Sequence, residues 1–439
     1  MELDRIQLFS KATCGEGNYR IPAMIVTNSG VVVAAADERI YGGGDNPNRI
    51  DKIVRRSKDS GKTWEDKIVV VKEVGKSKMH ASAAIDPALL YDDKNNRIYM
   101  LYTHTPAGIG ILNTHKGTGL TKDGDLLVYS KDKQYVKKDG ALYENGTKTD
   151  YTINEEGDVS LNGEYKGNIC VGDKDFKEKE TFFLMLTYSD DEGLTWCKPI
   201  CLNNQVKDEK FGFLGAGPGI GLRISKGKYA GRLVFPVYYS KGPSFMVMLS
   251  ATTIYSDDNG KTWNIGVSPN NTRKRLGFLP MNDKFLFPNE SITECQIIEC
   301  SDGHLKMFMR NHSGKKLIAL VDSYDGGVTW ENFRYQSQLV HCICQLSVIT
   351  TKDVDKDVTV FLNAADKKTR QNGVIRLSYD EGEHFEYSRC LKEGGFVYSS
   401  MAKLPDGTLG VLYEPSTRHE TVDFVKVDFD WIKDKEYQV

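Results

Sequence analysis

The feature that most constrains this sequence is an octapeptide, Ser-x-Asp-x-Gly-x-Thr-Trp, which occurs four times. The copies begin at Ser57, Ser189, Ser256 and Ser323. A degenerate fifth copy runs from Ser378 to Phe385, with Phe in place of Trp. In turns, Asp accepts hydrogen bonds from nearby backbone amides and Gly adopts positive φ without strain. Each copy therefore predicts the tip of a β-hairpin, with the indole packed beneath it and its N–H bonded to the backbone.

The spacing of the copies predicts the architecture. Successive copies start 132, 67, 67 and 55 residues apart. Spacings of this size are typical of one four-stranded blade per copy, so the array indicates a β-propeller. The longest interval holds the polar segment 105–180, with hairpin signals at Asp139-Gly140 and Asn145-Gly146. We predict an all-β, six-bladed propeller from residues 1–104 and 181–439, with residues 105–180 as a small inserted β domain.

Composition excludes several classes of function. The formal net charge of -2 argues against nucleic acid or an anionic membrane as partner. We find no apolar run near 18 residues and hence expect no membrane span, and the Met1 terminus lacks the basic and apolar regions of a signal peptide. The nine cysteines show no zinc-like spacing, and we expect most to be free, buried thiols. Such thiols fit a reducing compartment or a secreted enzyme equally well.

Short motifs across the chain carry the strongest functional signal. Near the N-terminus, Tyr19-Arg20-Ile21-Pro22 places an arginine on an apolar strand, where arginine is ordinarily a solvated edge charge. Further motifs follow in order: Asp37-Glu38-Arg39, Gly42-Gly43-Gly44-Asp45, Thr293-Glu294-Cys295-Gln296, Phe308-Met309-Arg310-Asn311, Arg370-Gln371-Asn372-Gly373, Tyr398-Ser399 and Leu412-Tyr413-Glu414. With the octapeptides, this ordered set resembles the sialidase (neuraminidase) family, and in particular the secreted clostridial-type exo-sialidases. The resemblance covers nearly the whole chain.

The resemblance implies a triad of arginines that binds the carboxylate of a terminal sialic acid. Its members would be Arg20, Arg310 and Arg370, with Glu414 as the ion-pair partner of Arg20. Guanidinium suits this task because its planar fork pairs with a carboxylate bidentately and keeps its charge.

The resemblance also implies the reacting groups. The sugar carboxylate would repel an anionic nucleophile, so a neutral tyrosine, Tyr398, would attack the anomeric carbon while Glu294 takes its proton. Asp45 would protonate the leaving oxygen, which requires its pKa to rise when the sugar covers it. A phosphate-binding reading of the three glycines before Asp45 fails, because no Lys-Ser/Thr and no helix follow.

Two more sugar contacts follow from the same resemblance. Arg39 would lie near the 4-hydroxyl, and Asp86, supported by Ile85, would accept the acetamido N–H. Asp86 precedes Pro87 and fits a turn cap equally well. No cofactor or metal is expected, because the chemistry needs none and the eight histidines form no ligand cluster in the sequence. The expected partners are sialylated glycans, the expected location is extracellular, and a monomer is plausible.

The type of product is left open. Some relatives form an anhydro or unsaturated sugar, using bulky aromatic and polar residues that exclude water. Here Ile292 precedes Glu294 and His419 is the only ring between residues 415 and 420, which favours ordinary hydrolysis. Thr105 and Ile343 stand where some relatives have aromatic residues. Two other classes of protein are alternatives: a non-catalytic propeller that binds sialic acid, and a different protein that carries the same octapeptide. The latter would lack the three arginines, and a pure binder needs no base beside a tyrosine.

Overall fold

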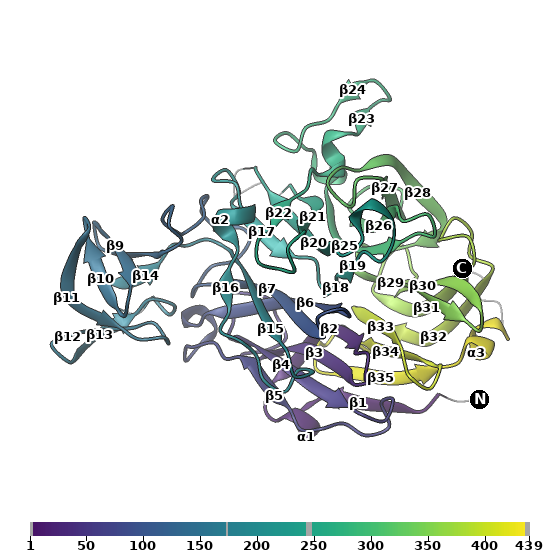
Figure 1. Ribbon diagram of the computed structural model, residues 1–439, viewed down its shortest axis with the longest axis horizontal. Coiled ribbons are helices and arrows are strands. Elements are labelled where there is room, and N and C mark those ends of the chain that lie inside the picture. The colour runs from purple at the N-terminus through teal and green to yellow at the C-terminus, as the bar shows by residue number, and fades with distance from the viewer. Residues whose placement is uncertain (1–2, 173, 243–247, 435–439) are drawn as a thin grey trace.

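The structure of the protein is a computed structural model that describes residues 3–172, 174–242 and 248–434. Antiparallel sheets surround a common centre, and one further sheet projects from one side (Figure 1). The helices are α1 (Lys11–Cys14), α2 (Asn203–Val206), α3 (Phe429–Lys433) and the 3-10 turns η1 (Lys78–His80), η2 (Gly227–Tyr229), η3 (Pro269–Asn271) and η4 (Pro288–Glu290). Over these described ranges, no helix has the length and apolar character needed to cross a membrane. The sequence prediction for the N-terminus starts at Met1, and residues 1 and 2 lie outside the described residues.

Four sheets form separate blades. Two of them comprise β25 (Ile292–Glu299), β26 (Leu305–Asn311), β27 (Leu317–Ser323) and β28 (Glu331–Val340), and β29 (Leu346–Asp353), β30 (Lys356–Ala364), β31 (Gln371–Ser378) and β32 (Tyr387–Gly395). A third comprises β17 (Phe213–Ala216), β20 (Leu233–Ser240), β21 (Ser250–Ser256) and β22 (Asn264–Ile265), with β19 (Leu222–Arg223) beside β20. The fourth has the order β33 (Ser399–Lys403), β34 (Leu409–Tyr413), β35 (Val422–Val427) and β1 (Arg5–Phe9), so the N-terminal strand pairs with the C-terminal ones.

The remaining strands correct the predicted number of blades. They are β2 (Asn18–Val26), β3 (Val32–Arg39), β4 (Ile50–Ser57), β5 (Ile68–Val71), β6 (Ala83–Asp92), β7 (Arg97–Thr105), β15 (Phe183–Ser189), β16 (Ile200–Cys201) and β18 (Gly219–Ile220). A parallel bridge between Ile50 and Ala83 joins β4 to β6, so these strands form one continuous nine-stranded sheet. The prediction of six separate blades is therefore wrong. The propeller-like, all-β arrangement is confirmed.

The octapeptides form the hairpin tips that the sequence predicts. In the first copy, the Gly61 N–H donates to Ser57 Oγ at 2.9 Å and the Thr63 N–H donates to Asp59 Oδ1 at 2.8 Å. The Trp64 indole donates to the Gly61 carbonyl at 3.2 Å, and the copies ending at Trp196 and Trp263 repeat this bond. Trp330 differs, because its buried indole nitrogen has no hydrogen-bond partner in the described part of the chain.

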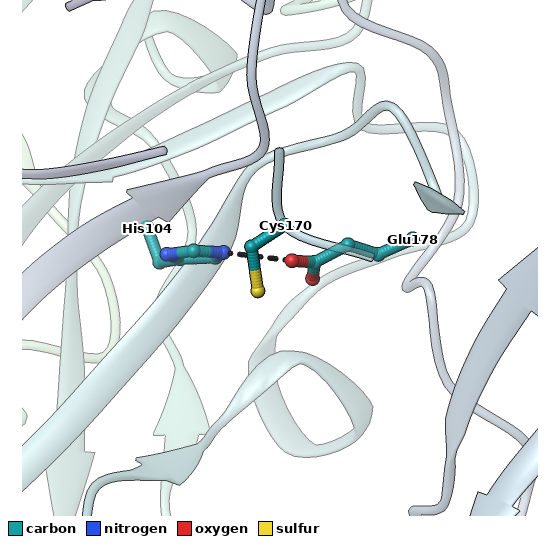
Figure 2. A group of neighbouring side chains, drawn as sticks. All are labelled: His104, Cys170 and Glu178. Atoms are coloured by element: carbon teal, nitrogen blue, oxygen red, sulfur yellow. Dashed lines mark hydrogen bonds and ion pairs between the residues drawn. The ribbon is translucent and has the colours of Figure 1, made fainter. Parts of the chain in front are cut away.

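A seven-stranded sheet lies within the predicted insertion and projects to the left in Figure 1. Its strands are β8 (Leu126–Ser130), β9 (Lys133–Lys138), β10 (Ala141–Glu144), β11 (Thr147–Ile153), β12 (Asp158–Leu161), β13 (Glu164–Asn168) and β14 (Phe176–Glu178). Both predicted hairpin turns occur, with positive φ at Asp139, Gly140, Asn145 and Gly146. Where this sheet meets β7, His104 lies beside Cys170 and Glu178 (Figure 2).

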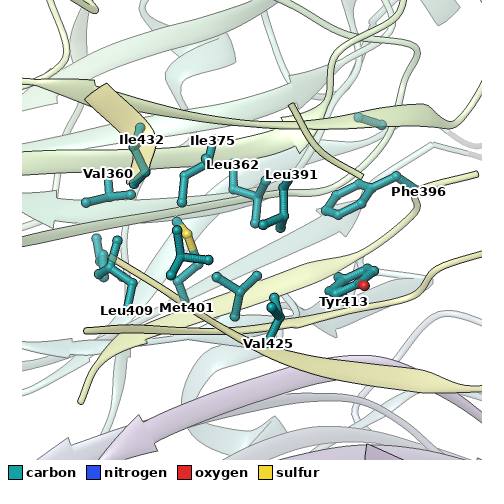
Figure 3. Close-up of a cluster of buried hydrophobic side chains, with 14 of the residues drawn as sticks. Val360, Leu362, Ile375, Leu391, Phe396, Met401, Leu409, Tyr413, Val425 and Ile432 are labelled. Carbon is teal, nitrogen blue, oxygen red and sulfur yellow. The ribbon is translucent and has the colours of Figure 1, made fainter. Parts of the chain in front are cut away.

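The core of the blades is built by alternating strand residues that face their neighbours across adjacent sheets. Figure 3 shows one such cluster, in which Val360, Leu362 and Ile375 from β30 and β31 pack toward Met401 and Leu409 from β33 and β34. Burial of this apolar surface is the main force that holds the blades together.

The cysteines match the sequence prediction only in part. All nine are free, as predicted. However, only Cys14, Cys295, Cys300 and Cys344 are buried, and the other five are partly exposed.

A second small hairpin lies at the edge of the blade assembly (top of Figure 1). It consists of β23 (Lys274–Arg275) and β24 (Leu279–Pro280).

Candidate active site

A cavity of about 510 Å³ opens where β2, β6 and β25 approach one another, and it gathers most of the predicted site residues. Its lining includes Arg20, Asp45, Ile85, Asp86, Glu294, Arg310, Arg370 and Tyr398. Arg39 and Glu414 lie beneath the lining and pair with residues in it. The structure thus brings together residues that are up to 394 positions apart in sequence.

Bulges in three strands turn these side chains into the cavity. The strand register shifts between Arg20 and Ala23 in β2, and between Ile85 and Ala88 in β6. A third shift follows Ile292 in β25, directly before Glu294. A bulge adds one unpaired residue and bends its strand, which re-aims the local side chains.

Tyr398, Glu294 and Arg310 form a closed hydrogen-bonded group on one wall of the cavity. The Tyr398 hydroxyl donates to Glu294 Oε1. Arg310 Nη1 donates to Glu294 Oε2 at 2.6 Å and to Tyr398 Oη at 3.0 Å. Burial, and then the charge of Glu294, raise the pKa of Tyr398 well above its usual value against the opposing charges of Arg310 and Arg370. The phenol is therefore neutral, with a base already in contact with its proton.

The second arginine, Arg20, is held from below by a buried carboxylate. Arg20 Nε donates to Glu414 Oε2 at 3.1 Å, and Glu414 Oε1 accepts the Ile21 N–H at 3.0 Å. The Glu414 side chain is fully buried. This contact fixes the guanidinium 5.6 Å above the centre of the Tyr398 ring.

The third arginine, Arg370, comes from the loop before β31 and lies on the same ring. Its guanidinium carbon is 5.7 Å from the centre of the Tyr398 ring. Unlike Arg20 and Arg310, Arg370 has no carboxylate ion-pair partner among the residues that the structure describes. Its donors are therefore available to an anionic ligand.

Asp45 is the most exposed of the predicted reacting groups, with 66% of its side chain accessible. Its Oδ1 accepts hydrogen bonds from Arg39 Nη1 at 2.6 Å and from Arg20 Nη1 at 3.1 Å. Desolvation works to raise the pKa of Asp45, but the charges of Arg39 and Arg20 outweigh it and lower the pKa to about 2. Without a ligand, Asp45 is thus an anion and cannot donate a proton.

A buried charge network supports this corner of the cavity. Arg39 is fully buried and donates to Asp37 Oδ2 through Nη2 at 2.8 Å. Lys52, also fully buried, donates to Asp37 Oδ1 and to the Ala84 carbonyl. Sequence reasoning missed Asp37 and Lys52 as parts of the site, although the Asp37-Glu38-Arg39 motif points to the first of them.

Asp86 lies in the cavity wall in a left-handed conformation, with φ of 64°. Desolvation raises the pKa of Asp86 well above its usual range, and the charges of Asp37 and Asp45 add to the effect. Its carboxyl group is therefore suited to hydrogen bonding in a neutral form.

The cavity also has an apolar wall that sequence reasoning missed, and a histidine that it noted without placing in the site. Phe182, Phe213 and Tyr238 pack against one another and line the cavity together with Ile111 and Leu249. His419 lines the opposite side and approaches Glu414 Oε2 at 3.1 Å through Nδ1. These residues belong to segments that carry no motif, so only their spatial proximity reveals them.

One glycine in the loop that carries Asp45 yields a prediction. A Cβ added at Gly43 would lie 2.7 Å from His419 Cβ and 2.9 Å from the His419 carbonyl oxygen. Gly43→Ala should therefore displace Asp45 and lower kcat about 100-fold, the effect expected from a misplacement near 1 Å. Gly44→Ala is the matched control, because its Cβ would meet only the flexible end of Lys78 at 3.4 Å. Equal turnover by the two variants in steady-state kinetics would contradict the packing argument.

Two curated relatives each match 93% of this chain. An anhydrosialidase of Macrobdella decora is 29% identical over 93% of this chain and 59% of its own length. A sialidase of Bacteroides fragilis is 27% identical over 93% of this chain and 62% of its own length. The chain therefore spans about three-fifths of the length of these curated relatives.

Solved structures agree over the full chain. The intramolecular trans-sialidase of Ruminococcus gnavus, in complex with oseltamivir carboxylate, superposes with a TM-score of 0.81 at 27% identity, covering 100% of this chain and 99% of that one. The leech intramolecular trans-sialidase, with 2,7-anhydro-Neu5Ac, gives 0.82 at 25% identity, covering 99% and 71%. Residues 169–411 match the BNR repeat-like domain family. The chain belongs to the BNR repeat-like domain family, and the curated relatives that it resembles are sialidases.

Proposed function

We propose that this protein is an exo-α-sialidase, which removes terminal sialic acids from glycoproteins, glycolipids and oligosaccharides. One observation carries the proposal: three guanidinium groups converge on a tyrosine that is hydrogen bonded to a glutamate. Arg310 lies 3.0 Å from the Tyr398 hydroxyl, and Arg20 and Arg370 lie within 6 Å of the centre of its ring, at 5.6 and 5.7 Å. A site of this kind suits a ligand whose carboxylate is attached to the reacting carbon.

In this proposal the three arginines hold the sugar carboxylate. Arg370 contributes a guanidinium with no ion-pair partner in the described chain, and Arg310 contributes a buried Nε that lacks a hydrogen-bond partner there. Arg20 exchanges its contact with Asp45 for one with the substrate. Bidentate guanidinium–carboxylate pairs supply both binding energy and orientation.

The proposed chemistry is a double displacement that retains the anomeric configuration. Tyr398 Oη bonds to the anomeric carbon as the glycosidic C–O bond breaks, and Glu294 takes the phenolic proton. Asp45 gives a proton to the leaving oxygen. In the second step Asp45 removes a proton from water, which attacks the anomeric carbon and returns Tyr398 to its free form.

The ion pairs of Asp45 predict an unusual pH dependence. Asp45 must be protonated to act as an acid, and its pKa is about 2 in the unliganded protein. When the substrate carboxylate takes Arg20, Asp45 loses one stabilising charge and its pKa rises. The pH dependence of kcat/KM reports the pKa of Asp45 in the free enzyme, whereas that of kcat reports its pKa in the complex with substrate. As the pH rises, kcat/KM should therefore begin to fall at a lower pH than kcat.

Two pH profiles on 3'-sialyllactose check this expectation. An aryl sialoside with an acidic phenol is the control, because its leaving group needs little protonation. With this substrate, the difference between the pH values at which kcat/KM and kcat fall should shrink. Coincident alkaline limbs for the natural substrate would contradict the proposed exchange of Arg20 between Asp45 and substrate.

A second candidate function is an intramolecular trans-sialidase on the same site. The apolar wall of Phe182, Phe213, Tyr238, Ile111 and Leu249 limits water at the cavity, which favours attack by the glycerol side chain of the sugar itself. The similar proteins of Macrobdella decora and Ruminococcus gnavus, an anhydrosialidase and an intramolecular trans-sialidase, favour the same reaction. Sequence reasoning favoured hydrolysis because it did not detect this wall.

Incubation with 3'-sialyllactose, followed by mass spectrometry and NMR, tests the proposal. Free sialic acid that appears first as the α-anomer supports the retaining hydrolase. A product lighter by one water and without a vinylic proton in its NMR spectrum supports the intramolecular reaction, whereas a vinylic proton would indicate elimination. No release, with a carboxylate-bearing inhibitor still bound, would reject catalysis and leave a sialic-acid-binding propeller.

The proposal extends to domains and surroundings. Residues 1–104 and 181–439 would form the catalytic unit, with residues 105–180 as its inserted β domain. Sialylated glycans are the proposed partners and the extracellular space the proposed location.

A further inference from the structure

Outside the catalytic cavity, we propose a zinc-binding site made by His104, Cys170 and Glu178. His104 lies near the end of β7, whereas Cys170 and Glu178 come from the loop after β13 and from the end of β14 (Figure 2). The ligand atoms of all three lie within 4.8 Å of one another. From the sequence no metal was expected, because the predicted chemistry needs none and the eight histidines form no ligand cluster.

Two of the three ligand atoms already have the spacing of tetrahedral coordination. His104 Nε2 and Glu178 Oε1 are 3.2 Å apart. On a tetrahedral zinc ion, with bonds of about 2.0–2.2 Å to nitrogen and oxygen, two such ligands lie about 3.3 Å apart. Imidazole and thiolate together favour zinc over calcium or magnesium, which prefer oxygen ligands. Three protein ligands leave the fourth position for a water molecule.

The histidine is oriented by a second carboxylate. His104 Nδ1 lies 2.8 Å from Glu73 Oε1, and the Ser82 hydroxyl donates to the other oxygen of Glu73. Histidines that bind metals usually give their remaining N–H to a carboxylate in this way, which fixes the ring and directs the other nitrogen to the ion. In the observed arrangement Nε2 points at Glu178 and Cys170 (Figure 2).

The cysteine is also held in place by its surroundings. The Cys170 N–H donates to Asn168 Oδ1 at 2.9 Å, and the Cys170 carbonyl accepts the Ala107 N–H at 2.8 Å. The second bond ties the loop of Cys170 to the chain that follows β7. The backbone of Cys170 is therefore anchored close to His104 and Glu178.

Metal binding replaces two protons. Zinc takes the place of the proton between His104 Nε2 and Glu178, and the Cys170 thiol loses its proton, both of which pass to solvent. The bound ion links β7 of the propeller to the seven-stranded sheet. Its role is structural, because it joins the propeller to the seven-stranded sheet. Its ligands are separate from the residues that line the catalytic cavity.

Titration of the full chain with zinc tests the proposal. Protein purified without a histidine tag and stripped with a chelator should bind one Zn²⁺ per chain, measured by elemental analysis after gel filtration. Cobalt(II), as a spectroscopic probe, should give thiolate-to-metal absorption in the near ultraviolet. Cys170→Ser should abolish that absorption, and Glu73→Gln should weaken zinc affinity about 10- to 100-fold by removing the negative charge beside the histidine.

Cys390→Ser is the matched control, because Cys390 is also a free, partly exposed thiol but lies in β32. It should bind zinc and cobalt as the parent chain does. Circular dichroism verifies that each variant is folded. Substoichiometric zinc in the parent chain, or unchanged cobalt absorption in Cys170→Ser, would overturn the proposal. Sialoside turnover is scored separately, so failure of the metal site and failure of the proposed function are distinguishable.

Discussion

Replacing Tyr398 by phenylalanine should lower kcat by at least about 1,000-fold, in line with the cost of removing a nucleophile from a group of residues that act together. The variant keeps the ring over which Arg20 and Arg370 lie but loses the hydroxyl that contacts Glu294 and Arg310. A phenyl ring cannot form the proposed bond to the anomeric carbon. Binding of a carboxylate-bearing inhibitor should survive, since the three arginines remain.

Tyr413→Phe provides the matched control for this experiment. Tyr413 is fully buried, and its ring stacks on Phe396 with 5.4 Å between centroids. Its hydroxyl has no hydrogen-bond partner within the described ranges, so its loss should leave turnover unchanged. Steady-state kinetics on 3'-sialyllactose and inhibitor titration by calorimetry measure both variants. Turnover by Tyr398→Phe within tenfold of the parent enzyme would remove Tyr398 from the role of nucleophile.

Replacing Arg310 by lysine should weaken binding of a carboxylate-bearing inhibitor about 10- to 100-fold. The guanidinium donates to Glu294 and Tyr398 from Nη1 and leaves Nε without a partner in the described chain, so it can serve both the base and a ligand. An ammonium keeps the charge but not the planar fork. Loss of one charge-assisted hydrogen bond costs about 1.5–3 kcal/mol, which corresponds to this change in Kd.

The control for this substitution is an arginine that forms an ion pair elsewhere in the structure. Arg97 donates to the two carboxylate oxygens of Asp190 at 2.6 and 2.7 Å and does not line the cavity. Arg97→Lys should leave inhibitor affinity unchanged. If Arg310→Lys binds the inhibitor as tightly as Arg97→Lys does, Arg310 is not part of the carboxylate site.

Local features of the fold could be predicted because they depend on residues close together in the chain. The octapeptide turns are an example, since the Ser57 hydroxyl donates to Asp59 and accepts the Gly61 N–H, all within five residues. The hairpin turns at Asp139-Gly140 and Asn145-Gly146 follow from the same short-range preferences. The division of the strands into sheets could not be predicted. A single bridge between Ile50 and Ala83 merges two repeats, and no local sequence signal encodes this bridge.

The sequence by itself indicated the propeller-like class, because the class follows from the spacing of the octapeptide repeats, and a family resemblance supplied the proposed reacting residues. Only the tertiary structure decided the state of those residues. Asp45 is an anion with a pKa of about 2 because Arg39, 6 positions away in the sequence, and Arg20, 25 positions away, both donate to its carboxylate. The apolar wall and the His104–Cys170–Glu178 group likewise exist only in three dimensions. Charge interactions and solvent exclusion depend on distance in space, which the order of residues alone does not specify.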